Sequence, residues 1–178
     1  YVTAVDYTED MLNKAKENTK EYQSQIEFYR MDAQKLEFEN NQFDVVISRN
    51  LTWNLENPVQ AYKEWFRVLK TDGILLNFDA NWYGYLYDEE KRMAYEKDRE
   101  NVERNQLDDH YLCTDIDRME EIAKKVPLSA KKRPGWDVEV LKEIGFTEIR
   151  TDESIWQSVW SEEERLNYAS TPMFLVSG

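Results

Sequence analysis

One stretch decides the fold: FDVVIS, at residues 43–48. It is a near-continuous apolar run, which is typical of a strand buried on both faces of a parallel sheet. A helix is predicted to follow, because Asn57 and Pro58 form a good helix start and apolar residues then repeat at helical spacing. The helix is expected to close at Gly73, and residues 74–79 are predicted to form the next strand.

The residues before this stretch show the same alternation. Residues 1–6 are predicted to form a strand that ends at Asp6, and Thr8 is the expected N-cap of the helix that follows. Residues 26–31 are predicted to form a second strand, which ends at Asp32. Strands that alternate with helices in this way are typical of doubly wound α/β folds, in which a mostly parallel sheet carries helices on both faces.

The alternation is interrupted by residues 84–133, which are highly charged and are predicted to be mainly helical. It resumes with a helix that starts at Trp136 and stops at Gly145. Strands are predicted at residues 146–151 and 173–177. The later part of the chain therefore returns to the same sheet after a helical insertion.

Composition limits the partners. A chain of 178 residues is enough for one domain, so residues 1–178 are expected to form a single unit with residues 84–133 as a cap. The net charge of −13 would repel a phosphate backbone and an anionic membrane surface, so neither nucleic acid nor a membrane is expected as a partner. The one cysteine, Cys113, cannot form an internal disulfide, which fits a cytoplasmic protein.

Acidic residues follow two of the predicted strands. The carboxylate of Asp6 could accept hydrogen bonds from both ribose hydroxyls of a nucleoside cofactor. Asp32 could accept one from an adenine amino group. Each acid taken alone is more simply a helix cap or a solvated side chain, and NAD enzymes also place an acid at the position of Asp6. The pair therefore indicates a nucleoside without naming the cofactor.

Other polar residues have less specific patterns. The stretch SRNLTW at residues 48–53 follows the most apolar strand, so it is either a pocket wall or a capped loop with a core indole. His110 is the single histidine and lies beside two acids, which is most simply a surface position. The run from Lys131 to Arg133 is most simply a solvated turn, with an anionic-substrate role as the alternative. No general base and no metal ligand is assigned.

In their order, these segments resemble the class I S-adenosylmethionine (SAM) dependent methyltransferases of the type 11 kind. DYTEDML at residues 6–12 resembles the acidic ribose-binding turn of that family, and MDA at residues 31–33 resembles its adenine-side turn. Residues 43–48 resemble its fourth strand. FRVLKTDGIL at residues 66–75 resembles a helix-turn-strand that the family usually writes with Leu-Lys-Pro-Gly-Gly, with Thr-Asp here in place of Pro-Gly.

The resemblance implies a Rossmann-like sheet and in-line transfer of a methyl group from SAM to a small-molecule acceptor. An NAD-dependent oxidoreductase and a non-catalytic interaction module are the alternatives. The cofactor residues implied are Asp6, Tyr7, Met11, Asp32, Ala33, Arg49 and Asn50. The implied walls of the acceptor pocket are Trp53, Asp79, Asn81, Trp82 and Tyr83, with residues 84–133 as the cap.

One feature of the family is missing from its expected place. A nucleoside-binding fold carries a glycine-rich turn about 20 residues before the ribose acid. That acid is Asp6 here, and the five glycines of the chain lie too far apart to form the turn. We therefore expect the first strand of the family sheet to be absent from between the strands that end at Asp6 and Ser48. Either these two strands pair directly, or another segment or a second copy fills the slot, and the chain as given is expected to be inactive and to bind no SAM.

Overall fold

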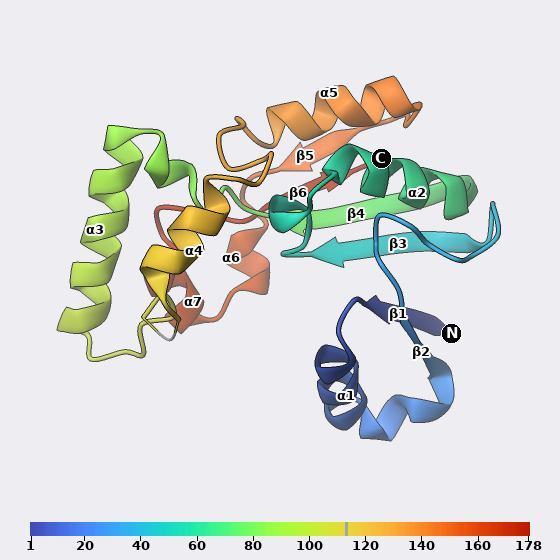
Figure 1. Cartoon of the computed structure of the whole chain (residues 1–178), viewed down its shortest axis with the longest axis horizontal. Helices are drawn as coiled ribbons and strands as arrows, with labels where there is room; N and C mark the ends of the chain where they lie inside the picture. Colours follow the sequence, from blue (N-terminus) through green and yellow to red (C-terminus); the bar gives the residue numbers. More distant parts are fainter. Residues whose placement is uncertain (113) are drawn as a thin grey trace.

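A computed structural model of the chain describes residues 1–112 and 114–178 (Figure 1). Cys113 lies outside the described residues. The strands form a two-stranded and a four-stranded sheet, in the orders β1-β2 and β3-β4-β6-β5. The fold is α/β, as predicted. The strands have the following bounds: β1 Val2–Asp6, β2 Ile26–Arg30, β3 Phe43–Arg49, β4 Leu69–Asp79, β5 Arg150–Asp152 and β6 Phe174–Ser177.

Strand directions follow the predicted pattern. β1 and β2 are parallel, and so are β3 and β4. β6 runs antiparallel to both of its neighbours, β4 and β5. β1, β3 and β4 all point to the same side of the molecule in Figure 1. Their carboxyl ends therefore lie at one edge, where ligands bind in open α/β sheets.

The N-terminal unit consists of β1, helix α1 (Glu9–Asn18), a 3-10 helix (Lys20–Gln25) and β2. Thr8 is the N-cap residue of α1, as predicted, but its side chain does not cap the helix. The Thr8 hydroxyl instead donates to Oδ1 of Asp6 at 3.0 Å, and the Thr8 N–H donates to the same oxygen at 2.8 Å. The turn after β1 is thus built around the Asp6 carboxylate.

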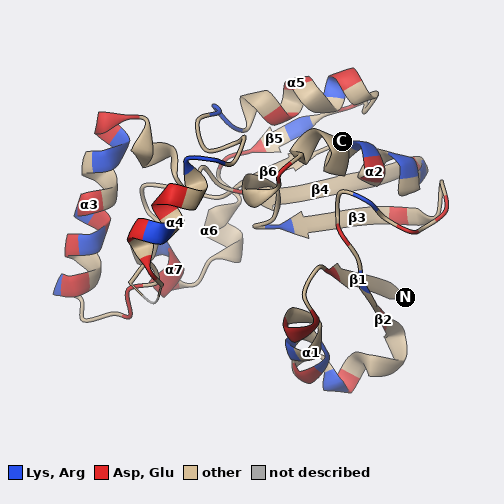
Figure 2. Ribbon diagram, in the orientation of Figure 1, with Lys and Arg blue, Asp and Glu red and all other residues tan. Residues whose placement is uncertain are grey.

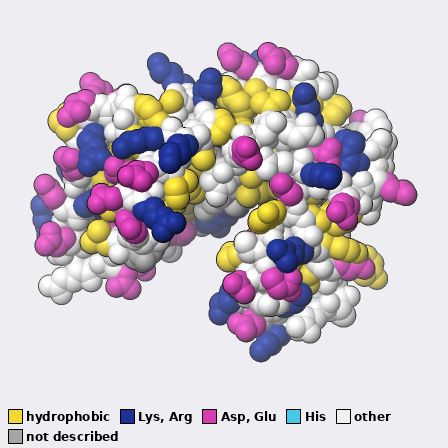
Figure 3. Space-filling model, viewed as in Figure 1, with side chains coloured by type: hydrophobic (Ala, Val, Ile, Leu, Met, Phe, Trp, Pro, Cys, Tyr) yellow, Lys and Arg dark blue, Asp and Glu magenta, His cyan; other side chains and the backbone are white. Residues whose placement is uncertain are grey.

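A slot separates the two sheets. Within the described residues, β1 pairs with β2 alone and β3 pairs with β4 alone, so direct pairing of β1 with β3 was a wrong prediction. A cavity of about 150 Å³ lies between them and is lined mainly by apolar side chains, among them Val5, Val46 and Trp65. Figure 3 shows apolar side chains along this junction. Occupation of the slot by another segment or a second copy stays a prediction.

Only one face of the four-stranded sheet is covered by the helices that the structure describes. Helices α2 (Pro58–Val68) and α5 (Gly135–Ile144) pack against Leu75 and Val176 in the main core. On the other face, Ile47 is 66% exposed and Ile74 is 49% exposed. The predictions that β3 is buried on both faces and that helices cover both faces were therefore wrong for the described residues.

Two strand boundaries differ from the prediction. β4 begins at Leu69, directly after α2, and pairs with Phe43 before the register shifts. The turn expected between helix and strand is therefore an irregularity inside β4, where Asp72 has φ of 66°. A Cβ on Gly73 would lie 2.9 Å from the Lys70 carbonyl oxygen, so only glycine fits there. β5 has three residues, because the chain turns at Glu148, where φ is 51°.

The predicted insertion is mainly helical. It contains a 3-10 helix (Gly84–Leu86), α3 (Glu89–Arg104) and α4 (Ile116–Ala123), and it lies beside the short helices α6 (Trp156–Val159) and α7 (Glu162–Asn167) (Figure 1). Acidic and basic residues alternate along the surfaces of α3 and α4 (Figure 2). A second core lies beneath them, formed by Tyr83, Tyr85, Tyr95, Tyr111 and Ala123. In the described part of the chain, no helix has the length and apolar character needed to cross a membrane.

Arg67 on α2 holds the connector from β2 to β3. Its guanidinium donates to the carbonyl oxygens of Phe38 at 2.7 Å and Leu36 at 3.0 Å. Glu64, one turn earlier, pairs with Arg67 at 2.8 Å and accepts from the Leu36 N–H at 2.9 Å. The hydrogen bond from Arg67 lowers the pKa of the Glu64 carboxyl below its ordinary value. Glu64 is therefore charged at neutral pH. The connector is thus fixed to the main core.

The first prediction tests this clamp. Arg67→Gln should lower the free energy of unfolding by about 1–3 kcal/mol, because two part-buried carbonyl oxygens lose charged donors. Urea denaturation measures the change. Arg150→Gln is the matched control, since Arg150 is 79% exposed and lies 3.6 Å from an equally exposed Glu148. Equal effects of the two substitutions would contradict the clamp.

Candidate functional site

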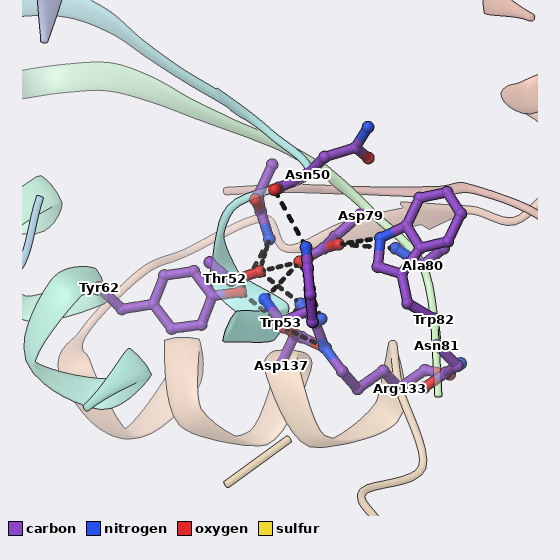
Figure 4. Close-up of polar contacts among 11 residues, drawn as sticks. Asn50, Thr52, Trp53, Tyr62, Asp79, Ala80, Asn81, Trp82, Arg133 and Asp137 are labelled. Carbon is purple, nitrogen blue, oxygen red and sulfur yellow. Dashed lines mark hydrogen bonds and ion pairs between the residues drawn. The ribbon is translucent and has the colours of Figure 1, made fainter. Parts of the chain in front are cut away.

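A buried guanidinium, that of Arg133, lies within a network of polar contacts (Figure 4). Arg133 has a side chain that is 1% exposed and lies between the carboxylates of Asp79, at 2.9 Å, and Asp137, at 2.8 Å. Burial alone would lower the pKa of Arg133, but Asp79 and Asp137 outweigh it and hold that pKa above its ordinary value. The charge therefore persists inside the core and joins β4 to α5.

Neutral polar groups complete this network. The Tyr62 hydroxyl donates to Asp137 at 2.5 Å, and Asn77 donates to the Tyr62 oxygen at 2.9 Å. Thr52 accepts from Arg133 at 2.7 Å. Burial, followed by the charge of Asp137, raises the pKa of Tyr62 well above its ordinary value, so the phenol stays protonated. The charge of Arg133 is thus paired with two carboxylates, and Tyr62, Asn77 and Thr52 add neutral hydrogen bonds around them.

Asp79 links the network to two tryptophans, one through its backbone and one through its indole. It ends β4 and is fully buried. Its Oδ2 accepts from the backbone N–H of Trp53 at 2.9 Å, and its Oδ1 accepts from the indole N–H of Trp82 at 3.2 Å. Oδ2 also accepts from the Thr52 hydroxyl, and Oδ1 from the Ala80 N–H at 2.9 Å. A single carboxylate therefore positions both tryptophans.

These tryptophans form part of the wall of one aromatic cavity. Its volume is about 300 Å³, at the lower end of the range for small-molecule pockets. Trp53 and Tyr83 lie with ring centroids 5.4 Å apart, and Trp82 meets Tyr168 edge to face at 5.1 Å. The lining residues are Asn50, Trp53, Trp82, Tyr83, His110, Tyr111, Thr114, Met119 and Tyr168. The wall thus joins the loops after β3 and β4 to the insertion and the end of α7.

Burial makes this wall neutral. It raises the pKa of Tyr83 to about 12, so Tyr83 is protonated at physiological pH. Burial likewise raises the pKa of Tyr111 above its ordinary value. Among the lining residues that the structure describes, none is Asp, Glu, Lys or Arg. The cavity therefore suits an uncharged, ring-bearing ligand.

Predicted pocket residues divide into two groups. Trp53, Trp82 and Tyr83 line the cavity together, and their role in binding stays a prediction. Asp79 and Asn81 were predicted to line it as well, which was wrong. Asp79 lies behind the indoles, and Asn81 donates to the Arg133 carbonyl oxygen at 3.0 Å. Both residues position the wall.

Two residues were misjudged from the sequence. Arg133 was expected in a solvated turn and is buried, although the acid four residues later, Asp137, was a visible sign of an ion pair. His110 was expected at the surface, but it is part-buried and lines the cavity. No local signal marked His110, because its neighbours in space come from residues 163–168.

The predicted ribose site lies at the end of β1. Both hydrogen bonds from Thr8 go to Oδ1 of Asp6, so Oδ2 is the oxygen that could accept from a ribose hydroxyl. Tyr7 is 68% exposed and Met11 is 59% exposed beside it. Two exposed apolar side chains next to a carboxylate fit one face of a nucleoside.

The predicted adenine site is partly occupied by the protein itself. Asp32 accepts from the Gln34 N–H at 2.8 Å and from the Gln34 side-chain amide at 3.1 Å. Ala33 is held to α2, because its carbonyl oxygen accepts from the Trp65 indole at 3.2 Å. The position of Asp32 is thus fixed, but Gln34 must turn away before both oxygens of Asp32 can reach a ligand.

Of the last two predicted cofactor residues, Arg49 ends β3 and Asn50 follows it. Arg49 reaches Glu164 of α7 at 3.4 Å and remains largely exposed. Asn50 has φ of 54° and lines the aromatic cavity. Its carbonyl oxygen accepts from the Trp53 indole at 3.1 Å. Asn50 therefore marks the side of the cavity that faces the carboxyl ends of the strands.

Comparison with known proteins agrees with this geometry. Residues 1–77 match the family described as a methyltransferase domain. Over these residues the chain is similar to methyltransferases. Residues 1–77 contain Asp6, Asp32 and Asn50, whereas most of the aromatic cavity lies later in the chain. The similarity to that family therefore covers the part of the chain that was predicted to bind the cofactor.

Individual relatives differ in how much of the chain they match. A demethylmenaquinone methyltransferase of Leptospira interrogans is 43% identical over 83 residues, which are 45% of this chain and 33% of that protein. The Bacillus halodurans protein BH2331 is 19% identical and matches 99% of this chain and 82% of its own, with a TM-score of 0.59. A Haemonchus contortus phosphoethanolamine N-methyltransferase, solved with SAM, is 17% identical over 98% of this chain and 42% of its own, with a TM-score of 0.64. The fold of these two solved structures thus extends over nearly the whole of this chain.

The second prediction tests the role of Asp79. Asp79→Asn should lower the free energy of unfolding by about 3 kcal/mol, because an amide has one acceptor oxygen for several donors and leaves Arg133 short of charge. Tryptophan fluorescence should shift as well, since Trp53 and Trp82 lose their common anchor. Asp44→Asn is the control, because Asp44 is 82% exposed and pairs with Lys70 at the surface. An Asp79→Asn protein as stable as the control would contradict the anchor.

Proposed function

We propose that the full-length protein transfers a methyl group from SAM to a small-molecule acceptor. The observation that carries the proposal is the common direction of β1 and β3, which belong to different sheets. Asp6, which ends β1, and Asn50, which follows β3, come from strands that point to the same side of the molecule (Figure 1). Asn50 opens onto the aromatic cavity. A nucleoside at Asp6 and an acceptor in the cavity would therefore meet near Asn50.

The residues present fit the nucleoside half of SAM. Oδ2 of Asp6 can accept from ribose, Tyr7 and Met11 offer apolar surface, and Asp32 can take the adenine amino group once Gln34 moves. SAM supplies an activated methyl group on a sulfonium. The work of the protein is then to align an acceptor behind that methyl and to keep water out.

The aromatic cavity supports the acceptor half of the proposal. Asp79 holds the Trp82 indole and the Trp53 backbone, and the Asn50 carbonyl oxygen accepts from the Trp53 indole, so the wall is organised before any ligand arrives. A preformed apolar wall lowers the cost of ordering a bound acceptor. The insertion contributes His110, Tyr111, Thr114 and Met119, which makes it the cover of the cavity.

The names of the curated relatives do not settle the acceptor. The family match ends at residue 77, and Trp82, Tyr83 and the insertion all follow that point. A quinone-like acceptor is compatible with the aromatic wall, as are other neutral rings. We propose a small, uncharged, ring-bearing acceptor, in keeping with the neutral lining and with the net charge of −13, which disfavours anions.

The slot between the sheets belongs to the same proposal. Backbone groups along the facing edges of β1 and β3 need partners, and open edges invite pairing with another strand. We propose that a further extended segment, from the same protein or from a second copy, occupies this slot. It would add backbone donors beside Asp6, on the side of the site where the methionine half of SAM belongs.

The third prediction tests the cofactor site. In the full-length protein, Asp6→Asn should weaken SAM binding by about 1.5–3 kcal/mol, the range for hydrogen bonds to a charged group. The asparagine side chain keeps an oxygen for Thr8, so the turn should survive. Isothermal titration calorimetry measures the affinity, and Asp10→Asn, in the first turn of α1, is the matched control.

Two results would count against the proposed function. Unchanged affinity in Asp6→Asn would remove this carboxylate from the site. Binding of NAD in place of SAM by the unsubstituted protein would make it an oxidoreductase on the same kind of sheet.

A further inference from the structure

Three side chains form a chain of hydrogen bonds at the wall of the aromatic cavity. Nδ1 of His110 lies 2.9 Å from the Tyr168 hydroxyl, and Nε2 lies 3.2 Å from Oε1 of Glu163. His110 and Tyr168 line the cavity, whereas Glu163 lies behind them with its side chain 45% exposed. A carboxylate, an imidazole and a phenol thus stand in series, with the phenol at the cavity.

The order of donors along this chain follows from chemistry. A carboxylate accepts hydrogen bonds and cannot donate, so the neutral His110 ring carries its proton on Nε2, facing Glu163. Nδ1 is then the acceptor, and the Tyr168 hydroxyl donates to it. A phenol oxygen that donates one hydrogen bond can still accept others. Tyr168 can therefore accept from a hydroxyl group in the cavity.

The backbone around His110 is firmly held. Asn167, which is fully buried, accepts from the His110 N–H at 3.0 Å and donates to the Asp108 carbonyl oxygen at 3.1 Å. Arg99 pairs with Asp109 at 2.5 Å and also donates to Asn167. These bonds tie the segment before His110 to the end of α7. The three side chains are thus pre-organised, as a proton relay requires.

We infer that Tyr168, backed by His110 and Glu163, takes the proton of a hydroxyl-bearing aromatic acceptor during methyl transfer. This inference rests on the proposed function. It adds the acceptor class, a planar ring with a phenolic or enolic hydroxyl, to that proposal. Such a ring matches the aromatic wall, and its hydroxyl matches the hydrogen-bonded chain that reaches the cavity from Glu163.

The step balances. The acceptor oxygen forms a bond to the methyl carbon, and the carbon–sulfur bond breaks with its electron pair going to sulfur. The acceptor proton passes to the Tyr168 oxygen as the Tyr168 proton passes to Nδ1 of His110. The imidazolium that results faces Glu163, which stabilises its charge. Tyr168 is the catalytic residue in this scheme, and His110 and Glu163 position it and hold the proton.

The fourth prediction concerns binding, and it needs no SAM. The unsubstituted chain should bind 2-naphthol about 3- to 10-fold more tightly than 2-methoxynaphthalene, the factor expected for one hydrogen bond. Tyr168→Phe should abolish that preference and leave binding of 2-methoxynaphthalene unchanged. Quenching of tryptophan fluorescence measures both affinities. Tyr87→Phe is the control, because Tyr87 is exposed and lies outside the cavity lining.

The relay has its own readout. His110 is the one histidine of the chain, so ¹⁵N-histidine labelling yields a single pair of ring signals. At pH 8 they should report a neutral ring with its proton on Nε2, and Glu163→Ala should produce a mixture of tautomers. Glu162→Ala, the neighbouring position on α7, should leave the signals unchanged.

Each opposite result overturns the inference. A proton on Nδ1, or a doubly protonated ring at pH 8, would show that His110 cannot accept from Tyr168. A preference for 2-naphthol that survives Tyr168→Phe, or binding of neither ligand, would overturn the acceptor class. Failure of the proposed function has a separate sign, loss of SAM binding by the full-length protein, which these measurements do not use.

Discussion

The burial of Arg133 between Asp79 and Asp137 is the constraint on which the rest of the structure depends. A guanidinium at 1% exposure is tolerated only when it is paired and hydrogen-bonded. Asp79 ends β4, and Asp137 lies in the first turn of α5. Their bonds to Arg133 therefore fix the start of α5 beside the end of β4, after the insertion. Asp79 also accepts hydrogen bonds from the backbone N–H of Trp53 and the indole N–H of Trp82. The same carboxylate therefore joins the fold to the wall of the cavity.

Much of the fold could be predicted, because it depends on local patterns. The start of α2 is an example: Asn57 accepts from the Gln60 N–H at 3.1 Å, as a helix cap does. Gly145 ends α5 with φ of 117°, which its lack of a side chain allows. The prediction that β3 is buried on both faces was wrong, because an apolar run such as residues 43–48 shows only that its side chains favour burial. It does not report which elements are present to cover them.

The candidate site was less predictable, for a physical reason. Trp53, Trp82 and Tyr83 could be named because they follow strands whose carboxyl ends converge at one edge. His110 and Tyr168 are 58 positions apart, and no period or motif relates them. The position of Arg133 depends on Asp79, 54 positions earlier, so the neighbouring lysines suggested a solvated turn. Side chains from distant segments meet only after the insertion has folded back.

This division has a consequence for how the chain can acquire specificity. Residues 1–77 match the family, and they hold the acids at the ends of β1 and β2. Of the residues that line the aromatic cavity, Asn50 and Trp53 alone come from that part, and the others come from residues 82–168. The two parts meet through Asp79, whose bonds to Trp53 and Trp82 span the boundary. Substitutions in the insertion can thus change the acceptor while the acids at the ends of β1 and β2 stay in place. Changes at Asp79 or Arg133 must affect stability and the acceptor wall together, because one buried charge pair supports both.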